Sequence, residues 1–178
     1  MTRIIAGERK GLHLYNPKNK RIRPTSDRVK EWIFSVLGSL EDVQVLDLYC
    51  GAGNLGIEAL SRGAAQCDFV DTSRDAVALT RRNVERAVYL SSARIIRRDC
   101  LAYLSQTDEK YHLVFADPPY HYTGEKSLFD TVRNVLYSKA MFVYESAAKV
   151  AIQVPNDLEI VRTRQLGTTT ITLSRYLP

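Results

Sequence analysis

The apolar positions of the chain change their spacing repeatedly, and these changes predict short strands separated by helices. The predicted strands are residues 43–48, 67–71, 94–98 and 112–117, and the predicted helices between them are residues 55–62, 74–87 and 100–105. Such alternation is typical of parallel βαβ units with helices on both faces of one sheet. The pattern therefore predicts an α/β fold.

The two ends of the chain depart from this alternation. After a predicted helix at 126–136 and a strand at 141–145, residues 158–164 and 168–176 are rich in β-branched side chains and predict a closing hairpin. At the other end, residues 3–7 and 11–15 predict a small hairpin with a basic tip. Thr25 or Ser26 can cap a helix with apolar positions from Val29 to Leu37, and Gly38 can end it. We expect one domain at 41–178, with residues 1–40 packed on it as a basic arm that faces RNA.

The first predicted strand leads directly into a loop with three glycines. Gly51 and Gly53 can adopt positive φ and let a ligand lie against the backbone, and Gly56 lets the next helix pack closely on the sheet. This spacing alone also fits dinucleotide-binding domains. Asp47 favours another ligand, because a carboxylate repels pyrophosphate and attracts a cationic amino acid group such as that of S-adenosylmethionine. The alternative role for Asp47 is that of a cap for the loop.

Acidic residues also follow the next two predicted strands. Asp71 can accept hydrogen bonds from the two hydroxyls of a ribose, and Asp99 can accept one from an adenine amino group. For each aspartate, the alternative is an ordinary helix N-cap. Three acids at the ends of three successive strands favour a nucleoside site.

The fourth strand ends in Asp117-Pro118-Pro119-Tyr120. The prolines remove two N–H groups and leave carbonyl oxygens that can accept hydrogen bonds from a ligand amine. Asp117 adds an anionic acceptor, and Tyr120 adds a flat surface on which a base can stack. A simple Pro-Pro turn would explain the prolines, but it would explain neither the carboxylate nor the ring. The motif therefore predicts a site for methylating an exocyclic amine.

Composition excludes several classes of protein. The 45% hydrophobic and 25% charged content is typical of soluble globular proteins, and no apolar run is long enough to cross a membrane. Charge interrupts the first residues, which excludes a signal peptide, so we expect a cytoplasmic protein. The three cysteines show no spacing typical of a zinc site or a disulfide framework. Cys50 resembles a nucleophile by its place in the glycine loop, but small loop filler is the favoured role.

The net charge of +5 is concentrated at the N-terminal end. Residues 1–30 hold nine Lys and Arg against two acids. Lysine and arginine contacts to phosphate supply much of the affinity for nucleic acids, although a charge cluster is often only a solvated surface. The candidate RNA-binding residues are Arg3, Arg9, Lys10, Lys20, Arg21 and Arg23.

Together these motifs resemble class I S-adenosylmethionine-dependent methyltransferases that act on amines. Residues 23–34, 47–53 and 55–64 narrow the resemblance to the bacterial small-subunit ribosomal RNA guanine-N2 methyltransferases, over nearly the whole chain. The resemblance implies a Rossmann-like, seven-stranded, mostly parallel sheet with an antiparallel C-terminal hairpin. It further implies methylation of one guanine of 16S rRNA, in the small ribosomal subunit or an assembly intermediate, by a monomer without a metal.

The resemblance also implies roles for single residues. Asp117, Pro118, Pro119 and Tyr120 would hold the target guanine. The implied cofactor-binding residues are Asp47, Tyr49, Gly51, Gly53, Asp71, Thr72, Asp99 and Cys100. The sequence departs from the family at Tyr49-Cys50, where Phe-Ala or Phe-Thr is usual, and at Asn54, where Ser or Thr is usual.

Three other functions fit parts of the sequence. An adenine-N6 methyltransferase acting on RNA or DNA would use the same proline-flanked site, but the chain has no sizeable insertion for target recognition. A non-catalytic RNA-binding assembly factor would be favoured by loss of a strand-end acid, and all four aspartates are present. An NAD-dependent enzyme would have no use for Asp117-Pro118-Pro119-Tyr120.

Overall fold

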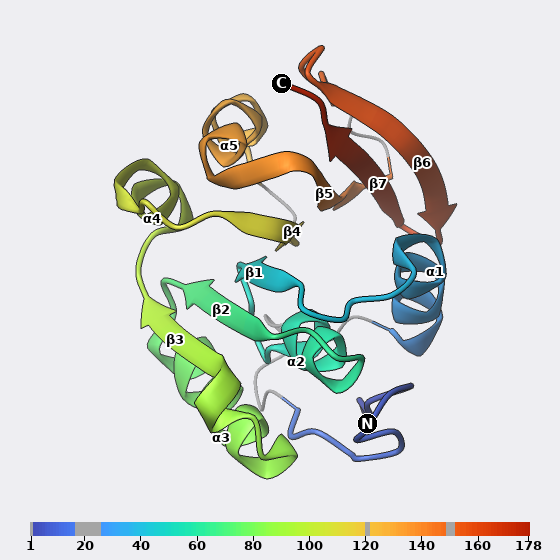
Figure 1. The fold of residues 1–178 in the computed structure, drawn as a ribbon, viewed down its shortest axis with the longest axis vertical. Helices are drawn as coiled ribbons and strands as arrows, with labels where there is room; N and C mark the ends of the chain where they lie inside the picture. The colour runs from blue at the N-terminus through green and yellow to red at the C-terminus, as the bar shows by residue number, and fades with distance from the viewer. Residues whose placement is uncertain (1, 17–25, 120–121, 149–151) are drawn as a thin grey trace.

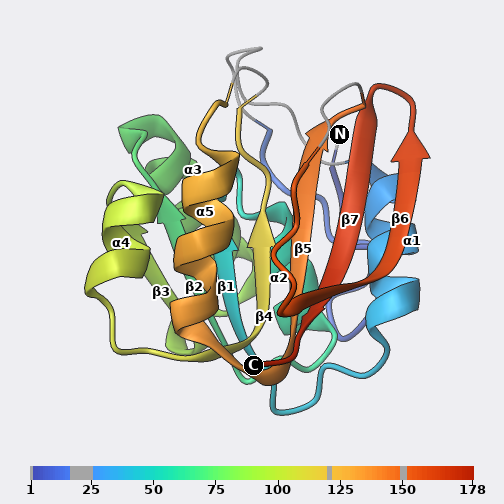
Figure 2. The same cartoon turned by 90° about the horizontal axis from the view of Figure 1, so that it is seen from above.

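One seven-stranded sheet runs through the middle of the molecule, with helices on both of its faces (Figure 1, Figure 2). The structure is a computed structural model that describes residues 2–16, 26–119, 122–148 and 152–178. The strand order is β3-β2-β1-β4-β5-β7-β6. The strands are β1 (Gln44–Leu48), β2 (Gln66–Asp71), β3 (Ala93–Arg97), β4 (Tyr111–Ala116), β5 (Leu136–Ala147), β6 (Leu158–Leu166) and β7 (Thr169–Tyr176).

The first five strands are parallel, and β7 pairs antiparallel with both β5 and β6. This arrangement confirms the predicted sheet and its C-terminal hairpin. Helices α1 (Asp27–Leu37), α2 (Asn54–Ser61) and α3 (Arg74–Ala87) cover one face of the sheet, and α4 (Cys100–Gln106) and α5 (Glu125–Val132) cover the other (Figure 1).

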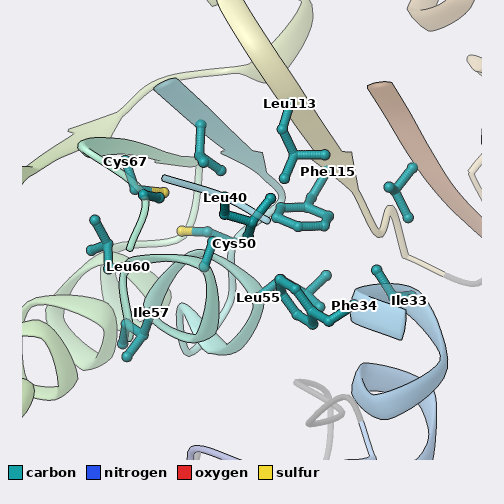
Figure 3. Close-up of a cluster of buried hydrophobic side chains, with 14 of the residues drawn as sticks. Ile33, Phe34, Leu40, Cys50, Leu55, Ile57, Leu60, Cys67, Leu113 and Phe115 are labelled. Carbon is teal, nitrogen blue, oxygen red and sulfur yellow. The ribbon is translucent and has the colours of Figure 1, made fainter. Parts of the chain in front are cut away.

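Each face of the sheet buries its own apolar core. On the α1 and α2 side, Phe34 packs against Phe115 of β4 with 5.8 Å between the ring centroids, and Leu55 lies beside them (Figure 3). On the α5 side, Phe129 packs edge-on against Phe142 and Tyr144 of β5. The two cores fix the helices on the sheet and so fix the strand ends, where the predicted site lies.

The predicted elements of the βαβ part agree with the observed ones to within one residue at each end. Helix α1 begins as predicted, because the Ser26 hydroxyl accepts a hydrogen bond from the Val29 amide at 3.3 Å, and it ends at Gly38, whose φ is 74°. Thr25, the alternative cap, lies outside the described residues.

Outside this part, the predicted N-terminal hairpin is present, whereas the predicted bounds of the elements around residue 136 were wrong. The N-terminal segments pair antiparallel through a bridge between Arg3 and His13 and the backbone hydrogen bonds on either side of it, although they are too short to count as full strands. Strand β5 begins at Leu136, well before the predicted residue 141, and the predicted helix at 126–136 ends at Val132, followed by a 3₁₀ turn at Arg133–Val135. In the added part of β5, Leu136 pairs with Tyr111, and the register between β4 and β5 shifts after this pair. Such an irregular stretch shows no simple alternation of apolar residues, so the sequence did not predict it.

The N-terminal segment, residues 2–16, is held against the helices by buried polar groups. The fully buried Glu58 of α2 accepts hydrogen bonds from the Ile5 amide at 2.9 Å and the Ala6 amide at 3.0 Å. Lys30 of α1 is also fully buried; its ammonium donates to the Arg3 carbonyl and lies 3.6 Å from the Glu58 carboxylate. The segment therefore depends on one buried ion pair.

Asn83 of α3 binds the C-terminal end of this segment, at Tyr15, through hydrogen bonds. Its Oδ1 accepts from the Tyr15 amide at 2.7 Å, and its Nδ2 donates to the Tyr15 carbonyl at 3.1 Å and to the Ala52 carbonyl at 2.9 Å. Since Ala52 lies in the glycine loop, one buried side chain joins the N-terminal segment to that loop.

We predict that Glu58→Ala lowers the free energy of unfolding by about 3 to 5 kcal/mol, because it leaves the buried Lys30 with only the partly exposed Asp27 carboxylate nearby and leaves two amides without an acceptor. Glu109→Ala is the matched control, since it breaks a surface pair with Arg94 in which Glu109 is 52% exposed, and it should cost less than about 1 kcal/mol. Urea denaturation followed by circular dichroism measures both. Equal costs would contradict the structural role of Glu58.

Candidate active site

Five acidic side chains lie at one edge of the sheet, where the five parallel strands end. Parallel strands end at the same edge, and register sets the depth of each residue. Asp47 is paired with Phe69 and Phe115, and Ala116 is paired with Tyr144, so that the residues after this last pair lie at the same level. The five acids are Asp99, Asp71, Asp47, Asp117 and Glu145, in the order in which their strands lie across the sheet.

The glycine loop that leaves β1 is tightly folded. Tyr49, Gly51 and Gly53 all have positive φ, at 55°, 55° and 76°, and the Gly53 amide donates to the Cys50 carbonyl at 2.7 Å. The Gly51 amide donates to Asp71 Oδ2 at 3.0 Å, which ties the loop to the end of β2. The predicted need for glycine at 51 and 53 is thus confirmed by the backbone conformation.

Asp47 lies beneath this loop and is only 3% exposed. Its Oδ2 accepts from the Gly56 amide in the first turn of α2 at 2.9 Å. Burial raises the pKa of the Asp47 carboxyl well above its usual value; the Gly56 hydrogen bond opposes this, and the nearby Asp117 and Asp71 carboxylates add to the rise. Asp47 does cap the loop, as the alternative role proposed, and a cationic ligand nearby would favour its charged form.

Gly56 has the role that its spacing predicted. A Cβ at this position would lie 2.3 Å from a ring carbon of Phe69 and 2.6 Å from the sulfur of Cys67, both in β2. Only glycine therefore lets α2 approach the sheet closely enough for its amide to reach Asp47.

Asp71 and Asp99 both make helix-cap contacts. Asp71 Oδ1 accepts from the Ser73 amide at 2.8 Å, and Asp99 Oδ1 accepts from the Ala102 amide at 2.9 Å as the N-cap of α4. Asp99 is exposed and Asp71 is partly exposed. Because a carboxylate oxygen has more than one lone pair, these contacts leave acceptor capacity for a nucleoside.

The two neighbours of these acids in the predicted cofactor set differ in exposure. Thr72 is exposed, whereas Cys100 is 1% exposed and its thiol contacts the Val70 carbonyl at 3.8 Å. The Cys100 side chain is therefore part of the wall below the site.

An open pocket of about 390 Å³ lies beside the end of β4. Asp117, Pro118 and Pro119 line one side of it, Tyr144 and Glu145 of β5 line another, and Tyr122 also faces it. The Tyr122 ring packs edge-on against Tyr49 of the glycine loop, with 5.5 Å between centroids, so the pocket adjoins the loop. Tyr120, the predicted stacking residue, lies outside the described residues.

Glu145 belongs to this pocket and was missed at the sequence level. It is 6% exposed, and within the described part of the chain its Oε1 has no hydrogen-bond partner. Burial raises the pKa of the Glu145 carboxyl well above its usual value, and the Asp117 and Asp47 carboxylates raise it further. Its place directly after the apolar run at 141–144 was the signal, since the aspartates were identified from similar places after apolar runs.

Of the candidate RNA-binding residues, three lie in the described part of the chain. Arg3 and Lys10 are exposed and Arg9 is partly exposed. Arg3 pairs with Asp27 at 3.0 Å and Arg9 with Glu8 at 3.3 Å. The other three, Lys20, Arg21 and Arg23, lie outside the described residues.

The site's chemistry is that of acceptors for N–H, O–H and cationic groups. In the part of the chain that the structure describes, no cluster of His, Cys, Asp or Glu is placed to hold a metal ion. No helix among the same residues is long and apolar enough to span a membrane. A row of carboxylates suits an organic cation, a ribose and an exocyclic amine better than it suits a polyphosphate.

Comparison with known proteins relates nearly the whole chain to one family. A family model described as Conserved hypothetical protein 95 matches residues 2–175. The chain is 32% identical over 162 residues to Ribosomal RNA small subunit methyltransferase D of Escherichia coli strain K12, covering 89% of this chain and 78% of that protein. It is also 32% identical over 178 residues to the Putative rRNA methyltransferase YlbH of Bacillus subtilis strain 168, covering 96% and 97% of the two chains.

A solved structure shows the same arrangement of sheet and helices. The putative methyltransferase yhhF from Escherichia coli has a TM-score of 0.89 to this chain at 27% identity, with 98% of this chain and 97% of that chain covered. The fold is therefore that of the methyltransferases, as predicted.

We predict that none of the three cysteines reacts with iodoacetamide in the native protein at pH 8. All three are buried; burial raises the pKa of the Cys50 and Cys67 thiols well above the usual value and that of Cys100 to about 12. Since the thiolate is the reactive form, reaction should require a much higher pH or unfolding. Mass spectrometry should find all three modified in denaturant, and rapid native modification of Cys50 would contradict its role as loop filler.

Proposed function

The chain belongs to the family described as Conserved hypothetical protein 95, and on this basis we propose that it methylates the exocyclic N2 amine of one guanine in 16S rRNA. S-adenosylmethionine is the methyl donor, and the substrate is the small ribosomal subunit or an assembly intermediate. The observation that carries the proposal is the pocket of Asp117, Pro118 and Pro119 directly beside the glycine loop and its acids.

The residues at the ends of β1, β2 and β3 would hold the cofactor. Asp47 and the glycine loop, with Tyr49, Gly51 and Gly53, would hold its methionine end, where the α-ammonium and the sulfonium are cationic. Asp71 with Thr72 accepts hydrogen bonds from the ribose hydroxyls. Asp99 with Cys100 lies at the adenine, where the free acceptor capacity of Asp99 meets the amino group.

The target base lies in the pocket at the end of β4. Asp117 and the carbonyl of Pro118 accept the two protons of the exocyclic amine, which turns the nitrogen lone pair toward the methyl group. As the nitrogen becomes positively charged, the Asp117 carboxylate stabilises that charge. When bound, S-adenosylmethionine would supply an electrophilic methyl group and leave as S-adenosylhomocysteine, and the proton that the amine loses would pass along its hydrogen bond to the Asp117 carboxylate. The base must be unpaired or flipped to enter.

The names of the relatives and the charge of the N-terminal segment support rRNA as the substrate. One relative is named as a small-subunit rRNA methyltransferase and another as a putative rRNA methyltransferase. Arg3, Arg9 and Lys10, with the cationic residues at 20–23, contact phosphates around the target. The protein acts in the cytoplasm as a monomer, with residues 1–40 as its RNA-facing arm and 41–178 as the methyltransferase domain.

The test is transfer of a labelled methyl group from S-adenosylmethionine to small subunits from cells that lack the activity, followed by digestion and identification of the nucleoside. N2-methylguanosine supports the proposal. N6-methyladenosine would favour the adenine methyltransferase, and cofactor binding without transfer would favour the assembly factor.

We predict that Asp117→Ala reduces methyl transfer by about 100- to 1,000-fold, because it removes the group that stabilises the developing charge. The dissociation constant for S-adenosylmethionine, measured by calorimetry, should change little. Full turnover by Asp117→Ala would exclude the assigned role.

Asp71→Ala should show the reverse pattern, with cofactor affinity reduced about 10- to 100-fold through the lost ribose hydrogen bonds.

We predict that Arg3→Gln combined with Lys10→Gln weakens RNA binding and makes it less dependent on salt. Each lost phosphate contact should reduce the slope of log K against log salt concentration by roughly 0.7 to 0.9. Filter binding across a salt series measures the slope. Lys139→Gln, an exposed change near the opposite ends of the strands, is the control, and an identical slope in all three proteins would show that the N-terminal cations do not contact RNA.

A further inference from the structure

Glu145 is a buried acid at the edge of the proposed base pocket, and its Oε1 has no hydrogen-bond partner among the described residues. It follows Tyr144, which pairs with Ala116, just as Asp117 follows Ala116, so the two acids lie at the same level on neighbouring strands. The residue is 6% exposed, and its side chain lines the pocket with Asp117.

Burying a carboxyl oxygen without a hydrogen-bond donor is unfavourable, and the sheet does not need an acid at this position. The packing of β5 depends on its apolar residues, such as Phe142 and Val143, which are buried in the two cores. A ligand that brings N–H donors into the pocket would satisfy the buried oxygen. The nearby acids Asp117 and Asp47 further favour a ligand that offers donors over one that offers acceptors.

We infer that Glu145 is the residue that selects guanine, by accepting hydrogen bonds from both N1–H and N2–H of the target base. This inference rests on the proposed function. A carboxylate can accept two parallel N–H bonds, one on each oxygen, and the Watson–Crick edge of guanine presents those two donors side by side. Adenine presents an acceptor at N1 beside its amine, so it offers a carboxylate one donor where guanine offers two.

Asp117 and Glu145 have different roles in binding the target base. Asp117, directly after β4, accepts a hydrogen bond from one N2–H of the exocyclic amine. Glu145, within β5, accepts from the other N2–H, in place of the Pro118 carbonyl, and also from N1–H. Asp117 can accept a hydrogen bond from any exocyclic amine. Glu145 distinguishes the bases by the ring atom beside that amine, which carries a hydrogen in guanine (N1–H) and a lone pair in adenine. Glu145 is thus a specificity-determining residue, and its loss should change which base is accepted.

The experiment compares two RNA fragments that carry the mapped target position, one with guanine and one with 2,6-diaminopurine. The analogue keeps the 2-amino group but has an acceptor at N1. The wild type should prefer guanine strongly. In Glu145→Gln the amide can donate to N1 of the analogue and accept from its 2-amino group, so the analogue should be accepted. The same amide offers only one acceptor to guanine, so kcat/KM for guanine should fall about 10- to 100-fold and the preference for guanine should disappear or reverse.

Two controls separate base recognition from folding. The dissociation constant of S-adenosylmethionine should be unchanged in Glu145→Gln, because the residue lies on the far side of Asp117 from β1. Glu159→Gln, an exposed change on β6, should behave as wild type with both RNAs.

The outcomes distinguish this inference from the proposed function. If the wild type makes no N2-methylguanosine, the proposed function fails, and the base assigned to Glu145 fails with it. If the wild type makes it and Glu145→Gln keeps the wild-type preference, whether at full rate or equally slowed on both RNAs, only the role of Glu145 is overturned.

Discussion

Repulsion among carboxylates at one edge of the sheet is the constraint on which the candidate site depends. Burial raises the pKa values of Asp47 and Glu145, and the nearby Asp117 carboxylate raises both further. The protein offsets part of this cost with the Gly56 amide, which donates to Asp47. A ligand that carries positive charge and N–H groups removes more of it. The repulsion among these carboxylates therefore favours a cationic methyl donor and an amine as ligands of the site.

The N-terminal segment and the glycine loop share one support. Glu58 and Lys30, both fully buried, hold the start of the segment, and Asn83 holds its end while also bonding the Ala52 carbonyl of the loop. A substitution that removes one of these contacts should therefore change the position of both the cationic segment and the glycine loop. The candidate RNA-binding residues on this segment are fixed relative to the cofactor loop by buried hydrogen bonds rather than carried on a free arm.

How far the sequence predicted this molecule depended on how local each signal is. The strands and helices from residue 43 to 117 follow apolar spacing and caps, and the glycine loop follows from φ requirements, so all were predictable. The hairpin at residues 2–16 was predicted, but its attachment to the domain was not, because Glu58, more than fifty residues away, supplies the acceptor for its amides. The length of β5 depends on pairing with Tyr111, and the burial of Glu145 depends on β4 and β7 beside it. Such long-range contacts leave no periodic mark in the sequence.

The order of the strands separates the two halves of the proposed chemistry. Sequential strands run outward from β1 through β2 to β3, and the next strand in the chain, β4, pairs on the other side of β1. Ligands in such sheets bind where the order reverses. Asp47 lies on one side of that point and Asp117 on the other, so under the proposed function a donor held by β1 to β3 would meet a base held by β4 and β5 across a single strand spacing. In-line transfer requires the amine and the sulfonium on opposite sides of the methyl group, and binding regions on the two sides of the reversal would let the ligands approach each other in this way.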